Sequence, residues 1–216
     1  MGSNMSLTIN DMMQLSPVIP VMVIEDVAAA IPLAQALVEG GLRVLEITLR
    51  TAAALDAIAA IKAAVPDAIV GAGTIINTET LHMALAAGAE FIVTPGCTPA
   101  ILAAAQNAAV PILPGVNTPS EAMVLLEQGI TAMKFFPAAA AGGIPMLKAM
   151  AGPLPQIRFC PTGGITLDNA KDYLALPNVA CVGGSWVAPA ELVKAANWNE
   201  IKRLAREAAA LQNTDG

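Results

Sequence analysis

Short apolar runs alternate with amphipathic segments along most of the chain. An apolar run bounded by Gly, Pro, Asn or Asp is typical of a buried strand, whereas apolar positions three and four residues apart indicate a helix. The pattern predicts strands at 18–24, 44–49, 69–73, 91–94, 111–115, 132–135, 158–162 and 180–183. It predicts helices between them at 28–38, 52–64, 80–87, 99–107, 120–128, 144–150 and 167–174, and after the last strand at 191–195 and 198–211.

This regular alternation predicts an α/β fold with a parallel sheet. The strands are apolar on both faces, as expected when helices cover both sides of a sheet. Eight strand–helix units suit a (β/α)8 TIM barrel, and a doubly wound open sheet is the alternative. Gly41, Gly88 and Gly129 each lie just before a predicted strand, where a helix end favours a residue with positive φ.

The barrel is expected to form one domain. A chain of 216 residues, 56% of them hydrophobic, can bury one large core. We expect this domain to span residues 5–216, with residues 1–4 added in front of the natural start at Met5.

The second predicted strand carries polar side chains on one face. Glu46, Thr48 and the following Arg50 share one parity, while Leu45 and Ile47 share the other. Because the aliphatic side chains suit the helical layer, we expect the polar ones to face the barrel interior or its mouth.

The sixth predicted strand holds a lysine in an apolar run. Alternation directs Met133 and Phe135 to the helices, and Lys134 and Phe136 inward. A lysine is rarely buried without a partner, so we expect Lys134 to meet Glu46 inside the barrel. Lys134 is interpreted as a nucleophile, and a buried structural ion pair with Glu46 is the alternative.

Several loops at the carboxyl ends of the strands carry small or polar residues. Thr74 follows the third strand and Pro95 the fourth. Glycine pairs follow the last two strands, at 163–164 beside Thr162 and at 183–184 beside Ser185. In barrel enzymes the loops after strands seven and eight often bind phosphate through backbone N–H groups, so we predict a phosphate site there.

Composition excludes several classes of function. The net charge is −6 and no run of Lys or Arg is present, which argues against binding to nucleic acid or an anionic membrane. No apolar stretch of ~18 residues and no secretory signal are found. Three cysteines without metal-ligand spacing favour buried thiols and the reducing cytoplasm. His82 is the only histidine, so a His-based metal site or Ser-His-Asp triad is excluded, and no metal is expected.

Six stretches together resemble the KDPG aldolases, which cleave 2-keto-3-deoxy-6-phosphogluconate and in many cases also 4-hydroxy-2-oxoglutarate. These stretches are 41–51, 70–74, 94–96, 134–138, 158–165 and 182–186. The resemblance implies a trimer of (β/α)8 barrels that works without a metal or organic cofactor. It also implies cleavage to pyruvate and glyceraldehyde 3-phosphate through a lysine Schiff base.

The resemblance assigns roles to the residues selected above. It implies that Lys134 forms the Schiff base and that Glu46 moves protons, with Arg50 and Thr74 on the pyruvate carboxylate. Pro95 and Phe136 would shape the pocket, with Thr162 near the sugar-derived hydroxyls. The phosphate would be held by Gly163, Gly164, Gly184 and Ser185.

The residues themselves suit this chemistry. Cleavage of the C3–C4 bond leaves an electron pair that a protonated imine accepts, and the lysine must attack as the neutral amine, which an apolar surround favours. Three alternatives remain open: an aldolase for the galactonate epimer, a phosphosugar isomerase, epimerase or synthase on the same barrel, and a non-catalytic phosphometabolite sensor.

Overall fold

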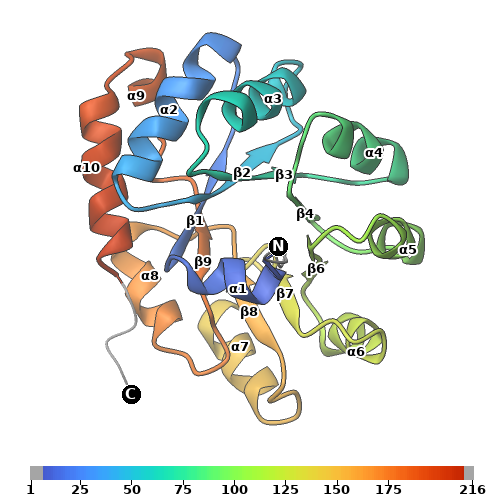
Figure 1. The fold of residues 1–216 in the computed structure, drawn as a ribbon. Coiled ribbons are helices and arrows are strands. Elements are labelled where there is room, and N and C mark those ends of the chain that lie inside the picture. Colours follow the sequence, from blue (N-terminus) through green and yellow to red (C-terminus); the bar gives the residue numbers. More distant parts are fainter. Residues whose placement is uncertain (1–6, 212–216) are drawn as a thin grey trace, which may run out of the picture.

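The computed structural model describes residues 7–211, so the predicted boundary at Met5 lies outside the described part of the chain. A central ring of parallel strands is surrounded by helices, in a TIM-type barrel (Figure 1). The strands are β1 (Val18–Met22), β2 (Val44–Thr48), β3 (Ile69–Gly73), β4 (Phe91–Val93), β5 (Ile112–Leu113), β6 (Gly115–Val116), β7 (Ala132–Phe135), β8 (Arg158–Pro161) and β9 (Val182–Gly184).

The order of the strands distinguishes a closed barrel from an open sheet. A six-stranded sheet runs β5-β4-β3-β2-β1-β9, and a three-stranded sheet runs β6-β7-β8. Parallel bridges from Phe159 to Val179 and from Thr162 to Gly183 join the two sheets beside β9. Because β1 pairs with both β2 and β9, the first and last strands are neighbours and the ring closes. The doubly wound alternative is therefore wrong.

The helices form the outer layer, apart from α1. They are α1 (Ile9–Gln14), α2 (Val27–Glu39), α3 (Ala54–Ala64), α4 (Thr78–Ala86), α5 (Pro99–Asn107), α6 (Pro119–Glu127), α7 (Gly143–Ala151), α8 (Leu167–Leu174), α9 (Ala190–Lys194) and α10 (Trp198–Ala209). Polar N-cap side chains begin several of them, including Asp26, Asn77, Thr98 and Thr118. Gly41, Gly88 and Gly129 have φ values of 101°, 98° and 77°, as predicted at the helix ends.

Two features differ from the sequence-based prediction. The predicted strand at 111–115 is broken at Pro114 into β5 and β6, because proline has no N–H to donate to a ladder. Helix α1 was missed, although Thr8 and Asp11 cap it with reciprocal hydrogen bonds. It lies across one end of the ring in Figure 1, and its Met12 and Met13 pack inside the barrel.

Two apolar clusters divide the core as the strand parity predicts. The barrel interior contains Val44, Ile69, Phe91 and Ala132, among others. The layer between strands and helices contains the opposite parity, including Leu45, Ile47, Met133 and Phe135. Among residues 7–211, no helix combines the length and apolar character needed to cross a bilayer.

Candidate active site

Lys134 and Glu46 meet inside the barrel, as predicted. Lys134 Nζ donates a hydrogen bond to Glu46 Oε1 at 3.2 Å, across a sequence separation of 88 residues. Lys134 is only 5% exposed and Glu46 only 3%. Strands β7 and β2 therefore place an amine and a carboxyl group in contact, nearly free of bulk water.

The surroundings of this pair are apolar on one side and aromatic on another. Phe91, Val93, Leu113 and Ala132 belong to the cluster that fills the interior beneath it. The ring centroid of Phe136, which is half-buried, lies 5.3 Å from Lys134 Nζ. An apolar floor and an aromatic face leave the Glu46 carboxyl as the hydrogen-bonding partner of the lysine.

Arg50 and Thr74 also come together, at the carboxyl ends of β2 and β3. Arg50 Nε donates to Thr74 Oγ1 at 3.2 Å, and the arginine side chain is exposed at the mouth. Thr74 has φ of 60°, a left-handed conformation that is unusual for a β-branched residue. Such strained residues cluster at binding sites, where the surrounding structure holds them in place.

Pro95 lies on the same rim, after β4, and is half-buried. Its backbone packs against Gly115, where any side chain would overlap the Pro95 carbonyl group. The hydroxyl of Thr94 accepts a hydrogen bond from Gly115 N at 3.2 Å. These contacts hold the end of β4 against β6, the strand that contains Gly115. Gly115 is directly opposite Lys134 on β7, so the rim at Pro95 is fixed relative to the lysine.

The loop after β8, where the sequence predicts a phosphate site, is built around two glycines with positive φ. Gly163 and Gly164 have φ of 98° and 76°, conformations that favour glycine at both positions. Their carbonyl groups are occupied: Gly163 O accepts from Ala139 N at 3.0 Å, and Gly164 O accepts from Asn169 Nδ2 at 3.0 Å. Within residues 7–211, the N–H group of Gly164 makes no hydrogen bond to the protein, so it can bind an oxyanion, whereas the N–H group of Gly163 lies at the bridge between Thr162 and Gly183.

Asn169 was missed from the sequence. Besides its bond to Gly164 O, its Oδ1 accepts from Thr166 N at 2.9 Å. One side chain on the first turn of α8 thus fastens both ends of the segment between the glycines and the helix. An Asn at the start of a helix signals a cap, and only the folded loop reveals this second bond.

The second glycine pair lies beside the first. Gly183 forms a bridge with Thr162, and a side chain at position 183 would overlap the Thr162 hydroxyl. Gly184 faces the helical layer, where the Trp186 ring covers it. Ser185 is exposed at the end of β9. The structure therefore brings Thr162 and both predicted loops to one edge of the barrel mouth.

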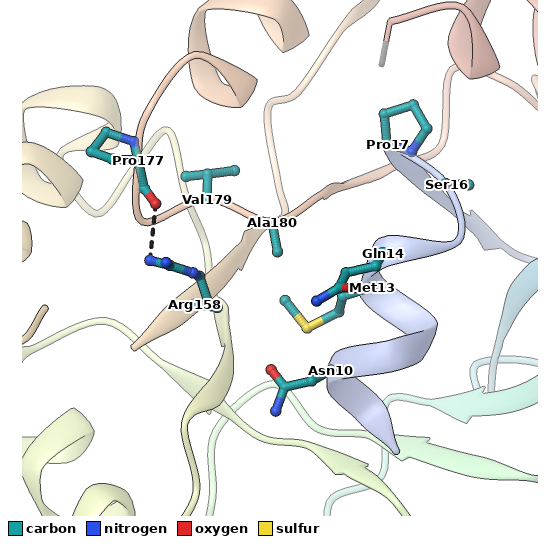
Figure 2. Close-up of a pocket in the computed structure, with 9 residues that line it drawn as sticks. All are labelled: Asn10, Met13, Gln14, Ser16, Pro17, Arg158, Pro177, Val179 and Ala180. Carbon is teal, nitrogen blue, oxygen red and sulfur yellow. Dashed lines mark hydrogen bonds between the residues drawn. The ribbon is translucent and has the colours of Figure 1, made fainter. Parts of the chain in front are cut away.

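A cavity of about 390 Å3 lies at the opposite end of the barrel, away from this site. Figure 2 shows it between α1, with Asn10 and Gln14, and the start of β8, where Arg158 donates to Pro177 O at 2.9 Å. Besides α1, its lining comes from residues at and just before the amino ends of strands, where TIM barrels carry stabilising residues rather than catalytic ones.

The remaining candidate groups lie outside the site or are buried. His82 is exposed on α4. Cys160 and Cys181 are buried free thiols inside the barrel. In the part of the chain that the structure describes, no three His, Cys, Asp or Glu side chains form a group that could hold a metal ion.

Comparison with known proteins matches the whole barrel. A family model described as KDPG and KHG aldolase matches residues 9–204. A 2-dehydro-3-deoxy-phosphogluconate aldolase of Pseudoalteromonas atlantica is 50% identical over 97% of this chain and 98% of its own length. A KHG/KDPG aldolase of Escherichia coli K12 is 52% identical over 89% of this chain and 90% of its own.

Solved structures give the same result. The crystal structure of KDPG aldolase from Legionella pneumophila, with pyruvate captured at low pH as a covalent carbinolamine intermediate, has a TM-score of 0.91 and 50% identity. The match covers 93% of this chain and 97% of that one. A native KDPGal structure is less similar, with a TM-score of 0.81, 26% identity and coverage of 90% and 93%.

Proposed function

The chain belongs to the KDPG and KHG aldolase family, and from this premise we propose that Lys134 and Glu46 carry out its aldol cleavage. The protein is a carbon–carbon lyase that splits 2-keto-3-deoxy-6-phosphogluconate into pyruvate and glyceraldehyde 3-phosphate through a lysine Schiff base. It also acts on 4-hydroxy-2-oxoglutarate, which gives pyruvate and glyoxylate. The observation that supports the assignment of residues is the buried contact of 3.2 Å between Lys134 Nζ and Glu46 Oε1.

Lys134 acts first as a nucleophile. Glu46, which accepts its hydrogen bond, takes a proton from the ammonium and leaves the neutral amine to attack the C2 carbonyl of the substrate. The resulting carbinolamine loses water, with Glu46 supplying the proton that its hydroxyl needs in order to leave. The product is a protonated imine on Lys134.

Glu46, now ionised, then acts as a base. It removes the proton of the C4 hydroxyl, and the C3–C4 bond breaks. The electron pair of that bond moves into the imine, which becomes an enamine. The C4 carbon leaves as the aldehyde of glyceraldehyde 3-phosphate. Return of the proton to C3 gives the imine of pyruvate, which water hydrolyses to free pyruvate and Lys134.

The other residues hold the two ends of the substrate. Arg50, with its planar guanidinium at the mouth, would bind the pyruvate carboxylate together with Thr74, with which it is hydrogen-bonded. The free N–H group of Gly164, with Gly163, Gly184 and Ser185 alongside, would bind the phosphate. Pro95 and Phe136 would flank the reacting carbons, and Thr162 would contact the sugar hydroxyls.

The rival functions are less well supported. The KDPGal structure shares 26% identity with this chain, against about half for the gluconate enzymes. An isomerase or a sensor does not need a buried amine with a carboxyl group beside it. Neither class predicts a covalent adduct with pyruvate.

Trapping with borohydride tests the assignment of Lys134. We expect incubation with pyruvate and borohydride to add the mass of one pyruvic acid less one oxygen atom, and peptide mapping to place it on Lys134. The Lys134→Met variant should gain no mass, while Lys148→Met, which changes an exposed lysine on α7, should gain it normally. An adduct that survives Lys134→Met would disprove the assignment.

We further propose a homotrimer of single-domain barrels that works in the cytoplasm. Support for self-association comes from large apolar side chains exposed on α4 and α6 and just before α4: Ile76 at 61%, Met83 at 45%, Met123 at 52% and Val124 at 57%. The three free cysteines suit a reducing compartment.

A further inference from the structure

The interior face of β3 carries two glycines, Gly71 and Gly73. Ile69 lies in the interior cluster and Val70 and Ala72 in the outer one, so alternation directs positions 71 and 73 inward. Neighbouring side chains fill the space at both positions. The Phe91 ring occupies the space at Gly71, and the Glu46 carboxyl occupies the space at Gly73.

The strand register explains why Glu46 reaches position 73. Glu46 is directly opposite Gly71, and Thr48 is opposite Gly73. Side chains in strands lean along the strand direction, and that of Glu46 extends toward the barrel mouth until its carboxyl lies over Gly73. A Cβ atom at position 73 would stand 2.7 Å from Glu46 Cδ and Cγ and would overlap Oε1, the oxygen that contacts Lys134 Nζ.

We propose that Gly73 is a positioning residue for the aldol reaction, because the missing side chain leaves the space in which Glu46 meets Lys134. The inference rests on the proposed roles of these two residues.

Backbone geometry does not require the glycine, since φ at Gly73 lies outside the left-handed region where side chains are strained. Its carbonyl accepts a hydrogen bond from Leu49 N at 2.9 Å, which alanine can also do. Glycine weakens a strand, so its presence calls for another reason.

The Gly73→Ala variant tests this role. We expect kcat to fall by about 100-fold, the effect of displacing a catalytic group by roughly 1 Å, while trapping with pyruvate and borohydride still labels Lys134. Exchange of the pyruvate methyl protons in D2O, which needs both the imine and the base, should fall with kcat. A kcat within twofold of the wild type, with normal exchange, would overturn the proposal.

A double-mutant cycle separates positioning of Glu46 from general damage. In the Glu46→Gln background the proton shuttle is already lost, so adding Gly73→Ala should cost less than about threefold more. If the two losses multiply instead, Gly73 acts independently of Glu46 and the proposal is wrong.

A matched substitution controls for the effect of alanine itself. Gly152 ends α7 with φ of −67°, and no heavy atom lies within 4 Å of a Cβ built there. Gly152→Ala should leave kcat, exchange and thermal stability close to those of the wild type. If the wild type itself gives no adduct, the proposed function fails; if it gives one and Glu46→Gln is impaired while Gly73→Ala is normal, only the role of Gly73 fails.

Discussion

Arg50 lies at the mouth of the barrel. Its guanidinium donates a hydrogen bond to the hydroxyl of Thr74. A guanidinium can donate two parallel hydrogen bonds to a carboxylate, and the ammonium of lysine cannot reproduce this geometry. Substitution of Arg50 by lysine keeps the positive charge but removes the planar pair of donors. It therefore isolates the contribution of the two parallel hydrogen bonds.

We expect Arg50→Lys to raise KM for the keto acid by about tenfold, with a smaller change in kcat, because one charge-assisted hydrogen bond is worth roughly 1.5 kcal/mol. Steady-state kinetics and the pyruvate concentration needed for half-maximal trapping measure the effect. Arg43→Lys is the control, since Arg43 Nε donates to Asp67 O at the amino ends of the strands. Equal losses in both variants would contradict a role in carboxylate binding.

Cys97 follows the Pro95–Gly96 rim, and burial raises the pKa of its thiol to about 11. A raised pKa keeps the thiol protonated until the pH approaches that value, so the reactive thiolate is scarce at pH 8. We expect iodoacetamide to label Cys97 roughly 100-fold more slowly at pH 8 than a free cysteine of pKa ~8.5, and labelling to accelerate up to about pH 11. Mass spectrometry over time measures this, with the urea-unfolded chain as control. Rapid labelling of the folded protein at pH 8 would contradict it.

At the scale of elements, alternation along the strands was the most informative signal in the sequence. It directed Lys134 and Glu46 inward, which their mutual hydrogen bond confirms, and Met133 and Phe135 to the helices, which the outer core cluster confirms. This succeeds because the side-chain period of a strand is fixed by its backbone, so a single aliphatic face orients every other residue.

Features that depend on contacts between elements could not be predicted in this way. The role of Gly73 requires the register of β2 with β3, and the second bond of Asn169 requires the folded loop after β8. Helix α1 is too short for a periodic pattern, and its position is set by packing of Met12 and Met13 into the barrel. In each case the sequence shows the residue, but its role depends on contacts that exist only in the folded protein.

The two hydrogen bonds by which Asn169 holds the loop after β8, where we proposed that the phosphate binds, lead to a prediction about substrates. Asn169→Ala removes the bonds to Gly164 O and Thr166 N, so the loop loses its fixed shape. We expect KM for the phosphorylated six-carbon substrate to rise about tenfold, as for the loss of one to two hydrogen bonds, while kinetics on 4-hydroxy-2-oxoglutarate, which has no phosphate, change less than twofold. Asn107→Ala, at the exposed end of α5, is the control. Equal losses on both substrates would show that Asn169 supports the whole site instead.

For the whole molecule, the proposed trimer needs a contact surface, and exposed apolar side chains point to one. Ile76, Met83, Met123 and Val124 belong to the part of the barrel that carries α4, α5 and α6, on the right in Figure 1. Single exposed hydrophobics are normal, but a group of them on neighbouring parts of a surface is typical of an interface. Burying these side chains against another copy would remove apolar surface that water now contacts.

We therefore expect the wild type to sediment as a trimer, and the double substitution of Met123 and Val124 by Glu to shift it to monomers. Each new carboxylate would have to be desolvated in the interface, at a cost of several kcal/mol. The interface would also lose the apolar contacts of Met123 and Val124. Leu15→Glu, which places one carboxylate on an exposed apolar residue just after α1, is the control and should remain trimeric. Since α6 contributes none of the proposed catalytic residues, the monomer should still form the pyruvate adduct on Lys134. A monomeric wild type would contradict the trimer. A doubly substituted protein that stays trimeric would show that the copies meet through another surface.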